Sequence, residues 1–202
     1  MVTQIFALGL LVFISSAFIF FLLEKKTEYL AINRLVFFTT TVSYAVLLSG
    51  LWVNYLPNCQ AIYPSRWLFY ILSCGLLMYE IGIILKKDNL VKLQMIFFNF
   101  IVMITGFLAS ITLVPYKWLF LFISCAAFLI ILMFIHQKTG KQTKLMNNVR
   151  WYVTITWSFF PIVWILAPTG VGLITITTTV FLYLLLDITT KICFACYVIN
   201  HK

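Results

Sequence analysis

Charged residues are scarce in this chain, and acidic residues are the scarcest. Only 9% of the 202 residues are charged, 63% are hydrophobic, and the mean hydropathy is +1.07. A soluble chain of this length would carry about 25% charged and about 45–50% apolar residues. The composition therefore excludes a soluble domain. It leaves five acids, whose positions are informative: Glu24, Glu28, Glu80, Asp88 and Asp187.

Other patterns are also missing. The first apolar run is of helix length with no cleavage site after it, which is unlike a signal peptide. The five cysteines form neither a metal-binding pattern nor a disulfide framework. Cys193 and Cys196 are spaced C-x-x-C, but they lie in an apolar run where small packing residues are expected. No metal site is predicted.

Seven apolar runs are long enough to cross a bilayer, which takes about 20 residues as a helix. Backbone groups in lipid must satisfy their own hydrogen bonds, and no alternating barrel pattern is present, so the runs are predicted to be helices. We expect an all-α membrane protein, one seven-helix transmembrane domain over residues 1–202. The expected spans are about 3–23, 35–54, 66–85, 93–114, 117–135, 151–167 and 172–199.

Basic residues are unevenly divided between the two sides of such a bundle. Two lie on one side, Arg66 and Lys117, and Lys191 lies within the last run. Basic loops face the cytoplasm, so we predict a multi-pass cell-membrane protein with its N-terminus outside and its C-terminus inside. The net charge of +9 then faces anionic lipid, and no nucleic-acid partner is expected. Eleven basic residues lie on the inner side: Lys25, Lys26, Arg34, Lys86, Lys87, Lys92, Lys138, Lys141, Lys144, Arg150 and Lys202.

Three ionisable residues fall inside the apolar runs, while Glu24, Glu28 and Asp88 are assigned to inner loops. The three are Glu80, Asp187 and Lys191. Charges within a bilayer are costly and usually mark function, although a purely structural ion pair is the alternative.

Asp187 and Lys191 are spaced i, i+4, which places them on one helix face about 6 Å apart along the axis. A lysine in an apolar site readily forms a Schiff base with an aldehyde, and a protonated Schiff base needs a carboxylate beside it. Run 151–167 adds an aromatic face beside a proline kink, either a core stripe or one wall of a slot for a flat conjugated ligand. Its residues are Trp157, Phe160, Pro161 and Trp164.

These features together resemble a microbial (type 1) rhodopsin over the whole chain: seven helices, D-x-x-x-K in the seventh and W-x-x-F-P-x-x-W in the sixth. The resemblance implies all-trans retinal bound covalently to Lys191 as a protonated Schiff base, with Asp187 as counterion. It also implies that Trp157 and Trp164 form the pocket wall. The family commonly has tyrosine where this chain has Phe160, so that hydrogen bond to Asp187 is missing; Tyr44 is a candidate to replace it.

The third run decides which group the chain resembles. Relative to Arg66, the family's diagnostic positions at +3, +7 and +14 are Phe69, Ser73 and Glu80. This F-S-E set is similar to the schizorhodopsins, described as light-driven inward proton pumps, and so is Tyr70, where tryptophan is usual. The resemblance also implies homotrimers and further pocket residues: Tyr70, Cys74, Leu77, Gly106, Phe120, Ser124 and Cys125.

The placement of acids favours inward transport independently of the resemblance. Phe69 cannot accept a proton, and beyond Asp187 the outer half has no acid, whereas Glu80 lies about 10 Å inward of Ser73. We therefore predict a light-driven inward proton pump, not an enzyme, in which Glu80 aids proton release toward the cytoplasm and the partners are protons and the bilayer. Alternatives are a photosensor with a separate transducer, a light-gated channel, and a solute transporter without retinal.

Overall fold

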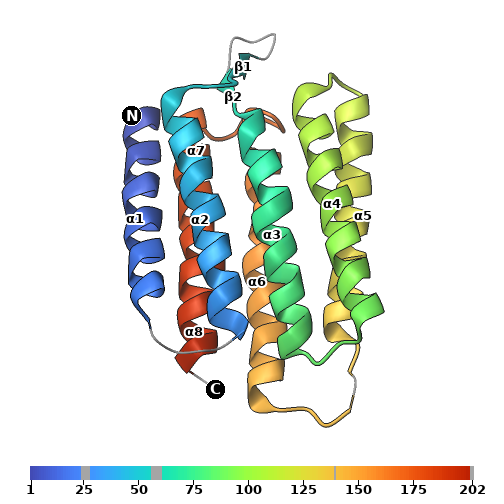
Figure 1. Ribbon diagram of the computed structural model, residues 1–202. Coiled ribbons are helices and arrows are strands. Elements are labelled where there is room, and N and C mark those ends of the chain that lie inside the picture. The colour runs from blue at the N-terminus through green and yellow to red at the C-terminus, as the bar shows by residue number, and fades with distance from the viewer. Residues whose placement is uncertain (24–27, 56–60, 139, 201–202) are drawn as a thin grey trace.

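The computed structural model describes residues 1–23, 28–55, 61–138 and 140–200, where seven long helical segments form one bundle (Figure 1). Each segment is long and apolar enough to cross a membrane. Glu24, Lys25, Lys26 and Lys202 lie outside the described residues. The segments are α1 (Val2–Leu22), α2 (Glu28–Ser49), α3 (Pro64–Ile84), α4 (Asn89–Ile111), α5 (Tyr116–His136), α6 (Lys144–Leu166), and a last helix made of α7 (Ile176–Asp187), η1 (Ile188–Cys193) and α8 (Phe194–Asn200).

Local sequence signals explain where several helices begin. Side chains of Asp88, Thr143 and Thr175 each accept a hydrogen bond from a backbone N–H three residues later, which caps α4, α6 and α7. Pro64 opens α3, where its missing N–H has no cost. These caps place Asp88 at a helix start, where it serves structure.

Several helix boundaries differ from the sequence prediction, among them the start of α6, which lies at Lys144 rather than near 151, and two boundaries around α2. Helix α2 begins at Glu28 rather than near 35, so Glu28 lies in its first turn and not in a loop. The polar start of α2 is stabilised because Arg34 donates hydrogen bonds to the carbonyls of Phe20 and Leu23 at the end of α1. A short antiparallel pair, β1 (Asn54–Tyr55) and β2 (Ala61–Ile62), follows α2 where helix had been expected up to residue 54.

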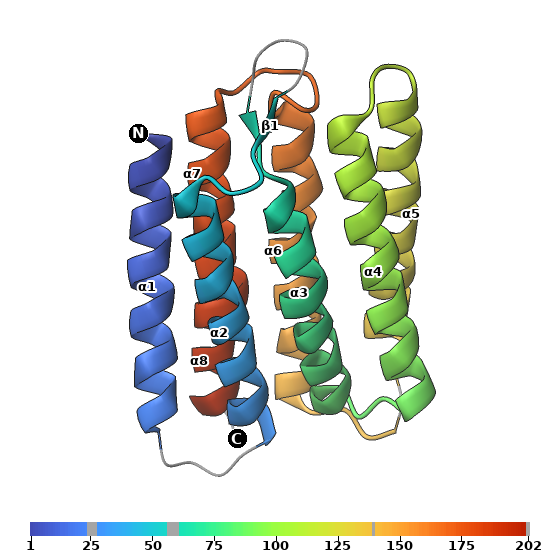
Figure 2. The same cartoon turned by 45° about the horizontal axis from the view of Figure 1, so that its top comes forward.

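The helices are arranged as a bundle with two distinct ends (Figures 1 and 2). Helices α1 and α2 lie beside the last helix at one edge, α4 and α5 form the other edge, and α3 and α6 lie between them. We call the end that carries Met1 and the β1–β2 hairpin the N-terminal face, and the end with the 85–88 and 137–143 connections the C-terminal face.

The last helix changes its geometry around Lys191. Six residues, Ile188–Cys193, form a π-helical segment between α7 and α8, and Lys191 lies within it. Single π turns are rare and are often found at functional sites. Hydroxyls of Thr189 and Thr190 bond the carbonyls four residues earlier, which helps the backbone to deviate here.

Candidate functional site

A buried ion pair lies in the middle of the bundle. Lys191 Nζ is 2.5 Å from Asp187 Oδ1, and their side chains are 1% and 2% exposed. The i, i+4 spacing therefore brings the two groups together, as the sequence predicts. A charge buried this deeply persists only with a partner, so each group stabilises the other in its charged form.

Two tyrosine hydroxyls hold the other oxygen of the carboxylate. Tyr44 of α2 donates to Asp187 Oδ2 at 2.8 Å, and Tyr70 of α3 donates to the same oxygen at 3.0 Å. The replacement bond expected from Tyr44 is confirmed, while that from Tyr70 was not foreseen. The ring of Phe160 lies edge-on to Tyr70, with centroids 5.9 Å apart. Tyr44 on α2 and Tyr70 on α3 therefore supply the hydroxyl hydrogen bonds that Phe160 on α6 cannot make.

Arg66 lies on the N-terminal side of this cluster. Its side chain is buried, and its guanidinium carbon lies 4.9 Å from the Tyr183 ring centroid and 6.0 Å from that of Phe6. Aromatic faces attract such a cation. Tyr63, just before α3, is half-buried, and burial raises the pKa of its phenol, which stays protonated at neutral pH.

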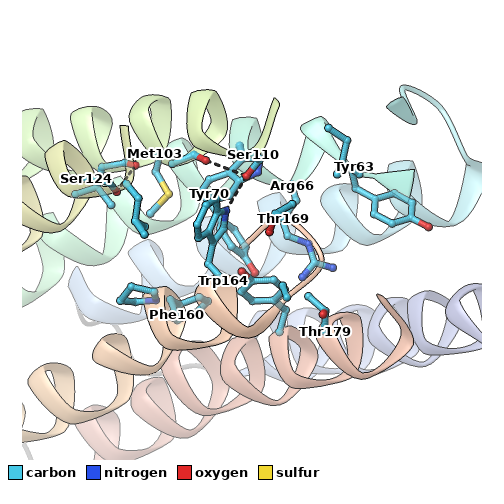
Figure 3. A pocket seen from close by; sticks show the side chains of 18 of the residues that line it. Tyr63, Arg66, Tyr70, Met103, Ser110, Ser124, Phe160, Trp164, Thr169 and Thr179 are labelled. Carbon is cyan, nitrogen blue, oxygen red and sulfur yellow. Dashed lines mark hydrogen bonds between the residues drawn. The ribbon is translucent and has the colours of Figure 1, made fainter. Parts of the chain in front are cut away.

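An apolar cavity runs from the ion pair region between α3, α4, α5, α6 and α7 toward the N-terminal face (Figure 3). At that end it is lined by Ala61–Tyr63 and by Pro168 and Thr169. Most of the predicted pocket residues line it: Tyr70, Cys74, Gly106, Ser124, Cys125, Trp157, Phe160, Pro161 and Trp164.

Three residues predicted for the pocket are not among its lining: Lys191, Leu77 and Phe120. The Lys191 amine contacts Asp187 instead of the cavity. The ring of Tyr70, which lines the cavity, has its centroid 4.6 Å from Lys191 Nζ. Leu77 is one turn beyond Cys74 and packs in the core. In α5, Leu121 lines the cavity where Phe120 had been predicted.

Leu121 lines the cavity in place of Phe120 because a helix advances about 100° per residue. The lining residues of α5 follow helical spacing from there: Leu121, Ser124, Cys125 and Phe128.

The cavity fits a flat conjugated aldehyde such as retinal. Trp157, Phe160 and Trp164 present aromatic surface to it, and the ring of Tyr70, which also lines it, lies 4.6 Å from the buried Lys191 amine. Trp164 is fixed because its indole N–H donates to Ser110 Oγ at 2.8 Å (Figure 3). A Cβ at Gly106 would come within 2.6 Å of the Trp67 ring, so glycine is needed for this close packing.

Glu80 lies in the C-terminal half of α3, fully buried and away from the cavity lining. Asn33 of α2, also fully buried, donates to Glu80 Oε1 at 2.6 Å and to the Tyr29 carbonyl at 2.8 Å. Asn33 was missed because the second span was predicted to begin at 35; a polar residue inside a span would have been the signal.

The remaining diagnostic positions, like Glu80, lie on α3. Phe69 is half-buried and does not line the cavity, and Ser73 is buried two turns C-terminal to Arg66. Read from the N-terminal face, α3 therefore presents a cation, an apolar ring, a hydroxyl and then a carboxyl group.

Comparisons with known proteins agree with this arrangement. The profile of the family described as "Bacteriorhodopsin-like protein" matches residues 1–201. The structure of schizorhodopsin 4 superposes with a TM-score of 0.92 and is 42% identical, covering 98% of both chains. The relatives of this chain include the Bacteriorhodopsin-II-like protein of Haloquadratum walsbyi, which is 28% identical over 89% of this chain and 78% of its own length.

Sensory rhodopsin-2 of Natronomonas pharaonis is 26% identical over 76% of this chain and 67% of its own. The relatives thus differ in the functions that their names state, while the family match extends along nearly the whole chain. This multi-pass membrane chain belongs to the bacteriorhodopsin-like family of microbial rhodopsins.

Proposed function

We propose that this protein is a light-driven inward proton pump that carries all-trans retinal on Lys191. The family match makes it a relative of light-driven pumps and sensors, and the 42% identity to schizorhodopsin 4 supports the proton-pump group. The observation that carries the direction is the placement of carboxyl groups. Asp187 is held beside the amine, and Glu80 lies in the C-terminal half.

Bound retinal would supply light absorption and a change of shape that redirects the proton on the Lys191 nitrogen. Trp157 and Trp164 would confine the polyene, and Tyr70 would contact the linkage, because these side chains line the cavity beside the amine. Asp187 would balance the positive charge. Its two tyrosine bonds and its contact with the Lys191 amine engage both carboxylate oxygens.

Among the residues that the structure describes, no carboxyl group beyond Asp187 can act as acceptor for a proton released toward the N-terminal face. Phe69 occupies the position where an acceptor would be needed, and Asp187 is held by three hydrogen bonds. A proton released toward the C-terminal face has an acceptor, since Glu80 is a buried carboxyl group on that side. Glu80 would therefore attract the proton leaving Lys191, and a new proton would arrive past Arg66.

The direction in the cell follows from the basic residues. Most lysines and arginines in the part of the chain that the structure describes lie at the C-terminal face. This supports placing that face in the cytoplasm and the N-terminus outside. Release at Glu80 is then inward transport. A homotrimer remains a prediction from family resemblance. The alternative is a photosensor acting through a separate transducer, which the similarity to sensory rhodopsin-2 favours.

The test uses cells that express the chain with added retinal. We expect a coloured pigment, lost in Lys191→Ala, and alkalinisation of the medium in light that a protonophore abolishes. Colour in Lys191→Ala would refute the attachment site. Light-driven acidification would refute the inward direction, and a pigment with no pH change would favour the photosensor.

A further inference from the structure

Tyr152 of α6 connects two helices at the segment that carries the functional lysine. Its hydroxyl donates to the Thr189 carbonyl at 2.6 Å. Thr189 lies between Asp187 and Lys191 in the chain, within the π-helical segment. The bond therefore anchors the backbone midway between the two members of the ion pair.

Aromatic packing around this hydrogen bond restricts the movement of α6 and of the last helix. The Tyr152 ring stacks on Tyr197 with planes 2° apart and centroids 6.4 Å apart, and it lies 5.9 Å from the Phe194 ring. Asn148, one turn earlier on α6, donates to the Tyr197 hydroxyl at 2.8 Å. A short contact zone thus joins the N-terminal half of α6, which lies nearest the C-terminal face, to η1 and α8 (Figure 1).

Side-chain hydrogen bonds support the π-helical segment both from within the last helix and from α6. Two of these, from Thr189 and Thr190, reach back along the same helix. Among the hydrogen bonds of the described residues, the Tyr152 bond is the one that a side chain of another helix makes to this segment's backbone. Its loss would remove this support from α6 and leave the backbone of the segment without a hydrogen bond from a side chain of another helix among the described residues.

We propose that Tyr152 is a positioning residue: its hydroxyl holds the Thr189 carbonyl and so fixes where the Lys191 nitrogen lies relative to Asp187. This inference rests on the proposed attachment of retinal to Lys191. It links the N-terminal half of α6, which like Glu80 lies toward the C-terminal face, to the nitrogen from which the proton leaves. Movement of α6 would then move the lysine segment with it.

The test compares Tyr152→Phe with Tyr197→Phe. Both remove one hydroxyl from the same stacked pair of rings, but only the first removes a bond to the π-helical backbone. Amide hydrogen exchange over residues 188–193 reports the segment, and the rate at which hydroxylamine bleaches the dark pigment reports the lysine linkage. One neutral hydrogen bond corresponds to about a 2- to 10-fold change in each rate.

We expect Tyr152→Phe to accelerate both rates by that factor and Tyr197→Phe to leave them near wild type. Unchanged exchange in Tyr152→Phe would overturn the inference. Faster exchange with unchanged bleaching would reduce Tyr152 to a structural residue and would also overturn the positioning role. If no pigment forms in the wild type, the proposed attachment fails, while exchange still decides whether Tyr152 holds the segment.

Discussion

Replacing Asp187 by asparagine should be strongly destabilising even without light. The Lys191 amine, 1% exposed, would lose a carboxylate 2.5 Å away, and the hydroxyls of Tyr44 and Tyr70 would lose a charged acceptor. Breaking a buried pair by removing one partner costs about 3–5 kcal/mol. Each tyrosine bond to a charged group is worth about 1.5–3 kcal/mol, part of which the asparagine oxygen retains. We therefore expect a loss of about 3–5 kcal/mol.

The assay is unfolding by titration with a denaturing detergent, followed by circular dichroism on retinal-free protein in lipid. Asp187→Asn combined with Lys191→Met removes both charges, so most of the loss should be recovered, giving a coupling of about 2–3 kcal/mol. Glu28→Gln, at the exposed start of α2, serves as the control and should change stability by less than about 0.5 kcal/mol. A loss below about 1 kcal/mol in Asp187→Asn, or additive effects in the double variant, would refute the reasoning.

Three further substitutions test the role of Glu80 and the contacts that support the ion pair. Glu80→Gln should retain colour but abolish or greatly slow light-driven transport, measured as the initial pH change per pigment. Asn33→Leu removes a donor 2.6 Å from Glu80 and should slow transport about tenfold, measured in the same way. Gly9→Ala would place a Cβ within 2.3 Å of the Tyr44 ring, so we expect a shifted absorption maximum and a loss of about 1–3 kcal/mol in stability.

Matched controls separate these effects from general disturbance of the core. Asn99 of α4 is as buried as Asn33 but donates to the Ile71 carbonyl, so Asn99→Leu should leave transport per pigment unchanged. A Cβ at Gly75 would have its nearest neighbours 4.0 Å away, so Gly75→Ala should be tolerated. Equal effects of Asn33→Leu and Asn99→Leu, or of the two glycine variants, would contradict the assigned contacts. Normal transport by Glu80→Gln would remove Glu80 from the mechanism.

The sequence predicts the bundle well because long apolar runs admit few other structures. It also predicts the ion pair, since i, i+4 spacing survives the π-helical segment and the partners attract each other. The boundaries were harder to predict. Helix α2 extends seven residues earlier than expected because tertiary hydrogen bonds of Arg34 stabilise a polar turn. That one boundary concealed Asn33.

Contacts between helices were predicted only where a family pattern existed. Tyr44 was expected beside Asp187, but the bonds from Tyr70 to Asp187 and from Tyr152 to Thr189 depend on how helices rotate against each other. A single sequence does not specify this rotation. The one-residue error at Phe120 has the same cause, since a small rotation of α5 decides which neighbouring side chain reaches the cavity.

The most direct test of the central claim is the sign of proton movement in proteoliposomes of known orientation. A protease site added at the N-terminus reports which vesicles expose the N-terminal face, and a trapped pH indicator reports the lumen. With that face outside, we predict that light acidifies the lumen, because protons leave Lys191 toward Glu80. Alkalinisation of the lumen in the same vesicles would contradict the account.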